Sequence, residues 1–236
     1  EPEQWMSVGR TMSEQHYRPL KQVNRNNVSA LGLAWYADFN VPRGQESTPL
    51  SVDGVIYVTT AWSNVRAYDA VSGATLWEFD ARVPGEWGVR ACCDVVNRGA
   101  ALWNGNVYVG TIDGRLLAID AVSGKQVWEA DTLIRRDVSY SITGAPRIIK
   151  GKIIIGNGGA EYGVRGYVSA YDAVSGELVW RFYTVPGDPA LGFEDDTMRM
   201  AAQTWNGQWW ALGGGGTVWD SMAYDAELDL LYIGTG

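Results

Sequence analysis

Two adjacent cysteines, Cys92 and Cys93, are the residues whose types and spacing most directly suggest chemistry. Their Cα atoms should lie about 3.8 Å apart, below the usual disulfide range, so a bond between them would close a small, strained ring. Such a bond would make a rigid, polarisable platform and would indicate an oxidising compartment. The alternative is two buried thiols that are neighbours by accident. Since these are the only cysteines, a disulfide framework and a CxxC metal site are excluded.

Five further residues each have both a structural and a chemical interpretation. Glu161 lies in a Gly-rich loop, where a carboxylate suits either a hard cation or a solvent-exposed turn. Arg98 and Glu46 are surface charges by default, but the planar guanidinium of Arg98 could clamp a carboxylate and Glu46 could contact a ligand. Thr217 and Trp219 follow four glycines, which either precede an ordinary strand or let the backbone approach a planar ligand closely.

The composition excludes several other kinds of site. The 236 residues contain one histidine, His16, so a Ser-His-Asp triad or a histidine-rich metal site is not expected. There is no phosphate-binding P-loop, and strand-like sequence follows the glycine clusters where a nicotinamide site would have a helix. A net charge of −8 argues against nucleic acid as a partner. No apolar run approaches the roughly 18 residues of a membrane-spanning helix.

The candidate residues interrupt a repeated phrase that must position them. AYDAVSGATLW, AIDAVSGKQVW and AYDAVSGELVW end at Trp77, Trp128 and Trp180, and this regular period indicates a stack of similar structural units. Twelve Trp, twelve Tyr and 29 Gly in a chain with few helix-forming runs predict an all-β protein.

Each copy of the phrase predicts the same set of strands. A lead-in strand, at 54–59 or 106–111, precedes a turn and a second strand, at 116–119 in the second copy. The Asp-Ala-Val-Ser-Gly turn and a third strand ending in Trp follow. With one outer strand this makes a four-stranded antiparallel blade of a β-propeller, with each Trp wedged between neighbouring blades. Weaker lead-in strands are expected at 152–157 and 229–234, a blade strand at 31–39, and a broken fourth copy at 223–227.

About four blades can be counted, the last of them incomplete. An open ring would leave two sheet faces exposed, so the propeller must be closed by further blades or by itself. With the last blade incomplete, we expect the N-terminal part of a larger propeller rather than a closed four-blade ring. The segments between the repeats are expected at the mouth of the central channel, where loops carry function. They comprise residues 43–49, 84–99, 156–163 and 213–220.

The chain resembles the quinoprotein alcohol dehydrogenases, which use pyrroloquinoline quinone (PQQ) and calcium, and is most similar to their quinohaemoprotein branch. The resemblance extends from about Trp5 to Gly236. In this family the repeat is the tryptophan-docking motif of an eight-bladed propeller, so residues 1–236 would be roughly the first half of a PQQ-binding domain. The other motifs that carry the resemblance are Gly85-Glu86-Trp87, Cys92-Cys93-Asp94, Asn97-Arg98-Gly99, Gly159-Ala160-Glu161 and Gly216-Thr217-Val218-Trp219.

The resemblance also implies roles for individual residues. Cys92 and Cys93 would form a vicinal disulfide stacked on one face of PQQ, with Trp219 on the opposite face. Glu161 would be the first calcium ligand, and calcium would polarise the quinone carbonyl that accepts hydride from the alcohol. The residues implied to hydrogen-bond the quinone are Glu46, Arg98, Thr143, Gly159, Ala160 and Thr217, and Gly158 belongs to the same cofactor site.

The function implied is PQQ- and calcium-dependent oxidation of an alcohol to an aldehyde. The enzyme would act in the periplasm or on the outer face of the inner membrane, and would pass electrons to a cytochrome c or a membrane quinone. A haem c domain and a membrane-associated cytochrome subunit are further expectations. No catalytic residue is expected within the chain, because the general-base Asp would follow Gly236. The 236 residues alone should therefore be inactive without the rest of the propeller.

Two other functions are kept as alternatives. A non-catalytic propeller scaffold should lack the adjacent cysteines, Glu161 and the Gly-Thr-x-Trp segment, all of which are present here. A PQQ-dependent sugar or aldose dehydrogenase would share the cofactor site and differ in its substrate.

Overall fold

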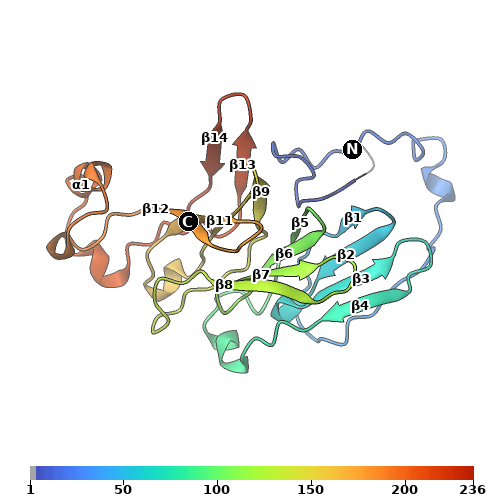
Figure 1. Cartoon of the computed structure of the whole chain (residues 1–236), viewed down its shortest axis with the longest axis horizontal. Coiled ribbons are helices and arrows are strands. Elements are labelled where there is room, and N and C mark those ends of the chain that lie inside the picture. Colours follow the sequence, from blue (N-terminus) through green and yellow to red (C-terminus); the bar gives the residue numbers. More distant parts are fainter. Residues whose placement is uncertain (1–3) are drawn as a thin grey trace.

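Three four-stranded antiparallel sheets and a two-stranded sheet make up the computed structural model, which describes residues 4–236 (Figure 1). Within each sheet the strands are hydrogen-bonded in chain order, so each sheet is an up-and-down blade. The predicted all-β class, the four-stranded blades and the partial propeller are confirmed. The strands are β1 Leu50–Val52, β2 Val55–Thr59, β3 Val65–Asp69, β4 Thr75–Phe79, β5 Ala101–Trp103, β6 Asn106–Gly110, β7 Arg115–Asp120, β8 Gln126–Asp131, β9 Arg147–Ile149, β10 Lys152–Gly156, β11 Tyr167–Asp172, β12 Leu178–Tyr183, β13 Met222–Asp225 and β14 Leu230–Ile233.

The Asp-Ala-Val-Ser-Gly turns form because their first and last residues supply the required chemistry. Asp120 Oδ1 accepts hydrogen bonds from the backbone N (2.7 Å) and the hydroxyl (2.6 Å) of Ser123. These bonds hold the pKa of Asp120 below its ordinary value. Gly124 has φ of 68°, a left-handed conformation that glycine adopts without steric cost. The predicted turn is therefore confirmed, and the other two copies repeat it.

Two of the repeated Trp residues, Trp77 and Trp128, join their blade to the next. Trp77 Nε1 donates a hydrogen bond to Ala121 O (2.9 Å), and its ring lies on Gly124, where an added Cβ would come within 2.7 Å of the indole. Trp128 repeats the pattern one blade later by donating to Ala173 O (3.3 Å). The prediction that the Trp rings wedge between blades is confirmed at these seams.

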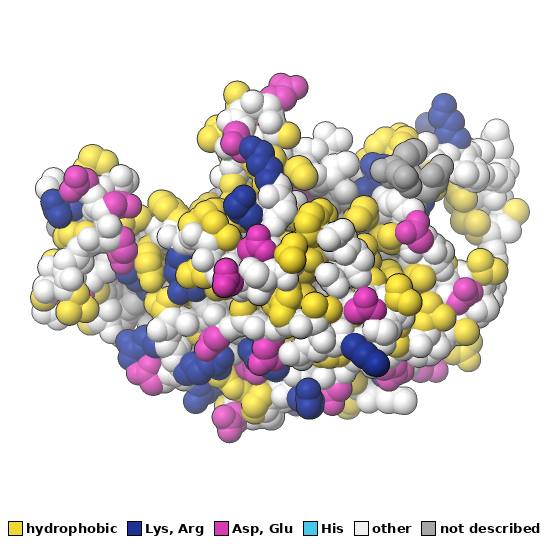
Figure 2. Space-filling view, in the orientation of Figure 1, with side chains coloured by type: hydrophobic (Ala, Val, Ile, Leu, Met, Phe, Trp, Pro, Cys, Tyr) yellow, Lys and Arg dark blue, Asp and Glu magenta, His cyan; other side chains and the backbone are white. Residues whose placement is uncertain are grey.

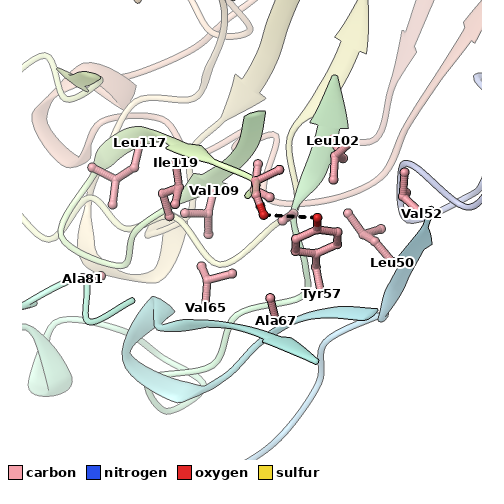
Figure 3. Packing of buried hydrophobic residues seen from close by; sticks show 13 residues of the cluster. Leu50, Val52, Tyr57, Val65, Ala67, Ala81, Leu102, Val109, Leu117 and Ile119 are labelled. Carbon is pink, nitrogen blue, oxygen red and sulfur yellow. Dashed lines mark hydrogen bonds between the residues drawn. The ribbon is translucent and has the colours of Figure 1, made fainter. Parts of the chain in front are cut away.

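Apolar side chains fill the space between successive blades. Between the first two blades, Val65 and Val109 lie in one fully buried cluster, and Tyr57 reaches across to donate a hydrogen bond to Ala121 O (3.3 Å) (Figure 3). Similar clusters join the second blade to the third and the third to β13 and β14. Since burial of apolar surface is the main stabilising contribution, these seams hold the blades together.

Two predicted elements are wrong. Residues 31–39 form no strand, because no described strand pairs with them, although Trp35 Nε1 still donates to Ala70 O (3.1 Å) on the first blade. Residues 223–227 are not a fourth copy of the phrase. They belong to β13 and the turn before β14, whereas each true copy follows its lead-in strand. In addition, the strands that carry the repeated Trp continue past it, to Phe79, Asp131 and Tyr183.

Residues 184–221, which we call the insert, leave the sheets between β12 and β13, and the part around α1 projects beyond the blades (Figure 1). The insert contains α1, Asp196–Ala202, whose first turn is capped by the Asp195 side chain accepting from Met198 N (2.8 Å). None of the helices within residues 4–236 is long and apolar enough to cross a membrane. The short 3₁₀ helices are η1 Val28–Ala30, η2 Ala61–Ser63, η3 Gly85–Val89, η4 Ala160–Tyr162, η5 Pro189–Leu191 and η6 Trp209–Leu212.

Acidic and basic side chains are interspersed over the face drawn in Figure 2. Their mixing, at a net charge of −8, gives this face no broad basic surface of the kind that nucleic-acid binding requires.

Candidate functional site

Five separate stretches of the chain enclose a pocket of about 240 Å³. The first follows the first blade, the second follows the second blade, the third connects strands of the third blade, the fourth is the end of the insert, and the fifth is Gly236 after β14. All the candidate residues from the sequence line this pocket except Glu46, which is ion-paired to one of them. The lining residues are Ala91, Cys92, Cys93, Arg98, Ser141, Thr143, Gly158, Gly159, Ala160, Glu161, Thr217, Trp219 and Gly236.

Cys92 and Cys93 form a disulfide across a Cα–Cα distance of 3.8 Å. This resolves the choice left open by the sequence, since the pair is bonded and exposed at the pocket rather than buried as thiols. The next residue, Asp94, has φ of 66° and accepts from Arg43 Nη1 (3.1 Å). Hydrogen bonding from the Val95 backbone, with smaller contributions from Gly44 and Arg43, lowers the pKa of Asp94. The ionised carboxylate thus anchors the disulfide loop to the segment before the first blade.

Arg98 is held by three other candidate residues. Its guanidinium donates to Thr143 Oγ1 (2.6 Å) and forms an ion pair with Glu46 Oε2 (2.9 Å). It also lies 5.0 Å from the centroid of the Trp219 ring, within the range of a cation–π contact. Asn97 fixes the backbone beside it by donating to Gly110 O (2.8 Å) at the end of β6. Arg98 therefore presents a fixed positive charge at the pocket.

Glu161 lies in the loop between β10 and β11, residues 157–166, which we call the Glu161 loop. It sits on η4, a single turn flanked by Gly159 and Gly163 in left-handed conformations, with φ of 107° and 76°. A Cβ on Gly159 would overlap the backbone oxygen of Ser139, so glycine is required at that position. Two backbone hydrogen bonds join Gly158 to Ser141 and hold the loop against the neighbouring segment.

Thr217 and Trp219 are brought to the pocket by close backbone packing. A Cβ on Gly156 would overlap Val218 O, and one on Gly144 would overlap Trp219 O. These two glycines therefore let the end of the insert run directly against the third blade. Trp219 keeps 44% of its surface exposed and so remains available for contact with a ligand.

Some residues that line or shape the pocket carry little signal in the sequence. Ser141 lines the pocket, and its sequence signal is weak, since only its nearness to Thr143 singles it out. Asn157 is fully buried and its side chain bonds Tyr167 N, Gly158 O and Arg165 O, which shapes the Glu161 loop. The helix of the insert was not predicted, because an isolated seven-residue helix carries little periodic signal.

The arrangement as a whole suits a flat, negatively charged ligand. A disulfide and an indole supply apolar, polarisable surfaces, and Arg98 supplies a cation. Hydroxyl groups of Thr143 and Thr217 and the glycine-rich backbone supply hydrogen-bonding groups around them. Glu161 has the only carboxylate side chain among the described residues that line the pocket, so a cation bound beside the ligand would contact it.

Comparison with known proteins shows a family to which the chain is similar. The family profile "Glucose/ethanol/alcohol dehydrogenase, beta-propeller domain" of the PQQ group matches residues 5–236. The chain is 62% identical over 234 residues to the quinohemoprotein alcohol dehydrogenase ADH IIB of Pseudomonas putida, covering 99% of this chain and 34% of that protein.

Two solved structures are similar over the full chain. The quinohemoprotein alcohol dehydrogenase ADHIIG of Pseudomonas putida HK5 has a TM-score of 0.97 at 56% identity, covering 100% of this chain and 35% of that one. A europium-containing methanol dehydrogenase has a TM-score of 0.88 at 37% identity, covering 100% and 42%. The chain thus spans about a third of the length of the curated relatives that it matches. Because the family profile matches almost all of it, the chain belongs to the PQQ family of glucose, ethanol and alcohol dehydrogenase β-propeller domains.

Proposed function

We propose that this chain is part of a PQQ- and cation-dependent alcohol dehydrogenase, in which residues 1–236 form the N-terminal part of the PQQ-binding propeller. The observation that carries the proposal is the pocket at which the Cys92–Cys93 disulfide, Arg98, Glu161 and Trp219 meet. The names of the relatives, quinohemoprotein alcohol dehydrogenases, support the same reaction class.

The residues of the pocket fit a tricyclic quinone that carries carboxylates. Its flat rings would pack against the disulfide and the Trp219 indole, and its carboxylates would pair with the Arg98 guanidinium. Thr143 already accepts a hydrogen bond from Arg98, so its hydroxyl is oriented by the same network. Thr217 pairs through its backbone with Gly236, in both directions, which fixes that side of the pocket. We assign quinone contacts to these residues and to Glu46, Gly158, Gly159 and Ala160.

The pocket fits a cation in part. Residues 4–236 contain no group of three or more His, Cys, Asp and Glu side chains that could hold a metal. Glu161 would therefore contribute one carboxylate to a cation that is held together with other groups. We assign calcium to this position, and the europium-containing relative makes a lanthanide the natural competitor in a binding test.

The part played by this chain is binding and orientation. A bound quinone supplies the two-electron acceptor for oxidation of the alcohol, and a bound cation supplies a Lewis acid. Arg98, fixed by Glu46 and Thr143, would orient the quinone and neutralise its charge. The disulfide and Trp219 would restrict its rings, and Glu161 would hold the cation beside it.

The substrate, electron acceptor and location follow as parts of the same proposal. We assign a small alcohol as substrate, an aldehyde as product, and a cytochrome c or membrane quinone as acceptor. The word quinohemoprotein in the names of the relatives favours haem as a further cofactor of the complete protein. The Cys92–Cys93 disulfide favours an oxidising compartment, and so a periplasmic location.

The test is a titration of the cofactor-free, full-length protein with PQQ, followed by quenching of tryptophan fluorescence, in calcium and in a chelator. We expect saturable binding that is tighter with calcium, and reduction of an artificial acceptor by primary alcohols. Absence of quinone binding would contradict the proposal and would favour a non-catalytic propeller scaffold. Oxidation of glucose in preference to every alcohol tested would indicate a sugar dehydrogenase.

A matched pair of variants tests the cation assignment. Glu161→Gln removes the charge of the pocket carboxylate and should weaken calcium binding by at least about tenfold. Glu177→Gln makes the same change at an exposed turn outside the pocket and should leave binding unchanged. Equal calcium affinity of the two variants would show that Glu161 is not a ligand.

A further inference from the structure

A guanidinium group on the Glu161 loop, that of Arg165, binds the insert. Arg165 Nη1 donates to Glu194 Oε1 (2.7 Å) and Nη2 donates to Oε2 (3.0 Å), so the pair is bidentate. Arg165 Nε donates to Val185 O (2.7 Å) at the start of the insert, and the guanidinium carbon lies 3.8 Å from the centroid of the Tyr183 ring. The planar fork thus ties the end of β12 to a residue in the middle of the insert.

This ion pair is more shielded from water than the other one in the insert. The side chain of Arg165 is 16% exposed and that of Glu194 is 39% exposed, whereas Arg199 and Asp196 are 63% and 93% exposed. Shielding strengthens a charge pair, because bulk water screens an exposed one almost completely. Hydrogen bonding from Arg165 also lowers the pKa of Glu194, so the carboxylate is ionised at neutral pH.

The insert in turn packs against the Glu161 loop through backbone contacts. Gly166 N donates to Gly215 O (2.8 Å), and Gly215 N donates to Val164 O (3.2 Å). A Cβ on Gly213 would overlap the backbone of Val164, so the two segments touch without intervening side chains. A displacement of the insert would therefore move the backbone of the loop that carries Glu161.

Glu161 has no side-chain anchor of its own. Its carboxylate makes no hydrogen bond or ion pair with another described residue, and the residue is exposed. The flanking Gly159 and Gly163 are both left-handed and add no side chain that could brace the turn. The position of the carboxylate is consequently set by the backbone of the loop.

We propose that Arg165 and Glu194 are positioning residues that hold the insert against the Glu161 loop and thereby set the affinity of the pocket for a cation. Neither residue lines the pocket. The part of this inference that concerns the cation rests on the proposed function, whereas the part that concerns the order of the loop does not.

The test uses Glu194→Gln in the full-length, cofactor-free protein, because this nearly isosteric change removes only the charge at a partly exposed site. Replacing Arg165 could prevent folding, since it would remove several buried contacts at once. Asp196→Asn is the matched control, as it neutralises an exposed carboxylate of the same insert, which among residues 4–236 is ion-paired with Arg199 alone. Glu194→Asp keeps the charge and should restore part of any lost function.

Two measurements are made on each variant. Amide hydrogen exchange of residues 160–166 should be about 10-fold faster in Glu194→Gln than in Asp196→Asn, in line with loss of a charged hydrogen bond. Calcium affinity, measured by calorimetry, should fall by about 10- to 100-fold, the usual effect of losing a partner that orients a ligand. In a Glu161→Gln background, Glu194→Gln should have no further effect on calcium affinity, because it acts through Glu161.

The outcomes separate this inference from the proposed function. Unchanged exchange of residues 160–166 in Glu194→Gln would overturn the inference. Faster exchange with calcium affinity lost in Glu161→Gln but kept in Glu194→Gln would overturn its cation part. If neither variant altered calcium affinity while exchange rose, the ligand assignment of the proposed function would be wrong and the loop contact would stand.

Discussion

The seams between blades and the pocket between loops are built in opposite ways. At the seams, the same contact recurs: an indole N–H donates to an alanine carbonyl of the next blade, and the ring covers a glycine. Large apolar clusters surround these contacts. At the pocket each contact occurs once and most are polar, as the Arg98 contacts with Glu46 and Thr143 illustrate, while Cys92, Cys93, Glu161 and Trp219 stay exposed.

The difference teaches where stability and binding reside. A seam buries apolar surface, so its loss should unfold the chain. A pocket keeps polar groups and an aromatic face available, so a change there should alter ligand affinity more than stability. Repetition fits the first task because the same contact stabilises both seams between four-stranded blades. Binding needs different groups at different places, and so the pocket residues fall where the repeat is interrupted.

The largest effect on stability is expected at Trp128, in a seam, and Trp219, in the pocket, is its comparison. Trp128→Ala should lower the free energy of unfolding of the full-length, cofactor-free protein by about 3 kcal/mol, at the lower end for a Trp because the ring is half-buried. Trp219→Ala should cost about 1 kcal/mol or less, since that ring is 44% exposed, while weakening quinone binding. Denaturant titration measures both, and equal destabilisation would break the distinction between seam and pocket.

The next largest effect is expected at Arg98, where a substitution should change quinone binding and not stability. Arg98→Lys keeps the charge but loses the fork that reaches both Thr143 and Glu46. We expect quinone affinity to fall by roughly 10- to 100-fold, the equivalent of one lost charged hydrogen bond, with the denaturation midpoint almost unchanged. Fluorescence titration and denaturation together check this. A large loss of stability with unchanged affinity would show that Arg98 belongs to the scaffold.

A smaller effect separates the docking contact from backbone strain. Gly124 and Gly105 both have positive φ, 68° and 79°, but an added Cβ at Gly124 would meet the Trp77 ring, whereas at Gly105 it would meet nothing within 4 Å. Gly105→Ala should cost about 1 kcal/mol from the left-handed conformation alone. Gly124→Ala should cost about 1 kcal/mol more, because the indole must shift. Equal destabilisation by the two substitutions would mean that packing of the Trp77 ring does not require glycine at position 124.

The smallest effect concerns the charged turns. Because Ser123 lowers the native pKa of Asp120, the turn contributes stability above the unfolded pKa and loses it as pH falls through the native pKa. Asp120→Asn should therefore flatten the pH dependence of unfolding slightly in the range of roughly pH 5 to pH 3. Denaturation at several pH values measures the slope. An unchanged slope would show that the charge does not stabilise the turn.

Much of the fold could be predicted because its determinants are local. The Asp-Ala-Val-Ser-Gly turns, the alternating strands and the period of the Trp residues specify four-stranded blades without reference to distant residues. The errors arose where local sequence imitates the pattern. The Ala223-Tyr224-Asp225 segment resembles the phrase, yet it lies before its lead-in strand rather than after it. Residues 31–39 have strand-like composition but lack a pairing partner among the described strands.

The pocket could be predicted only as a set of candidates. Its residues stood out as interruptions of the repeat, and all but Glu46 line one cavity. The polar contacts that organise them left no comparable signal. Asn97 and Asn157 bond backbone groups that folding brings close, and the Arg165–Glu194 pair joins a loop to an insert whose helix was not expected.

The sequence by itself determined the blades, their turns and the tryptophans between them, because strand pairing and turn formation depend on residues close together in the chain. Only the tertiary structure decided that Cys92 and Cys93 are bonded, that Arg98 lies between Glu46 and Thr143, and that the insert lies against the Glu161 loop. For the disulfide the reason is that adjacent cysteines are compatible with both the thiol and the bonded form. For the other two the reason is distance, because they join segments that meet only after the blades have stacked, and stacking depends on apolar packing that no single segment encodes.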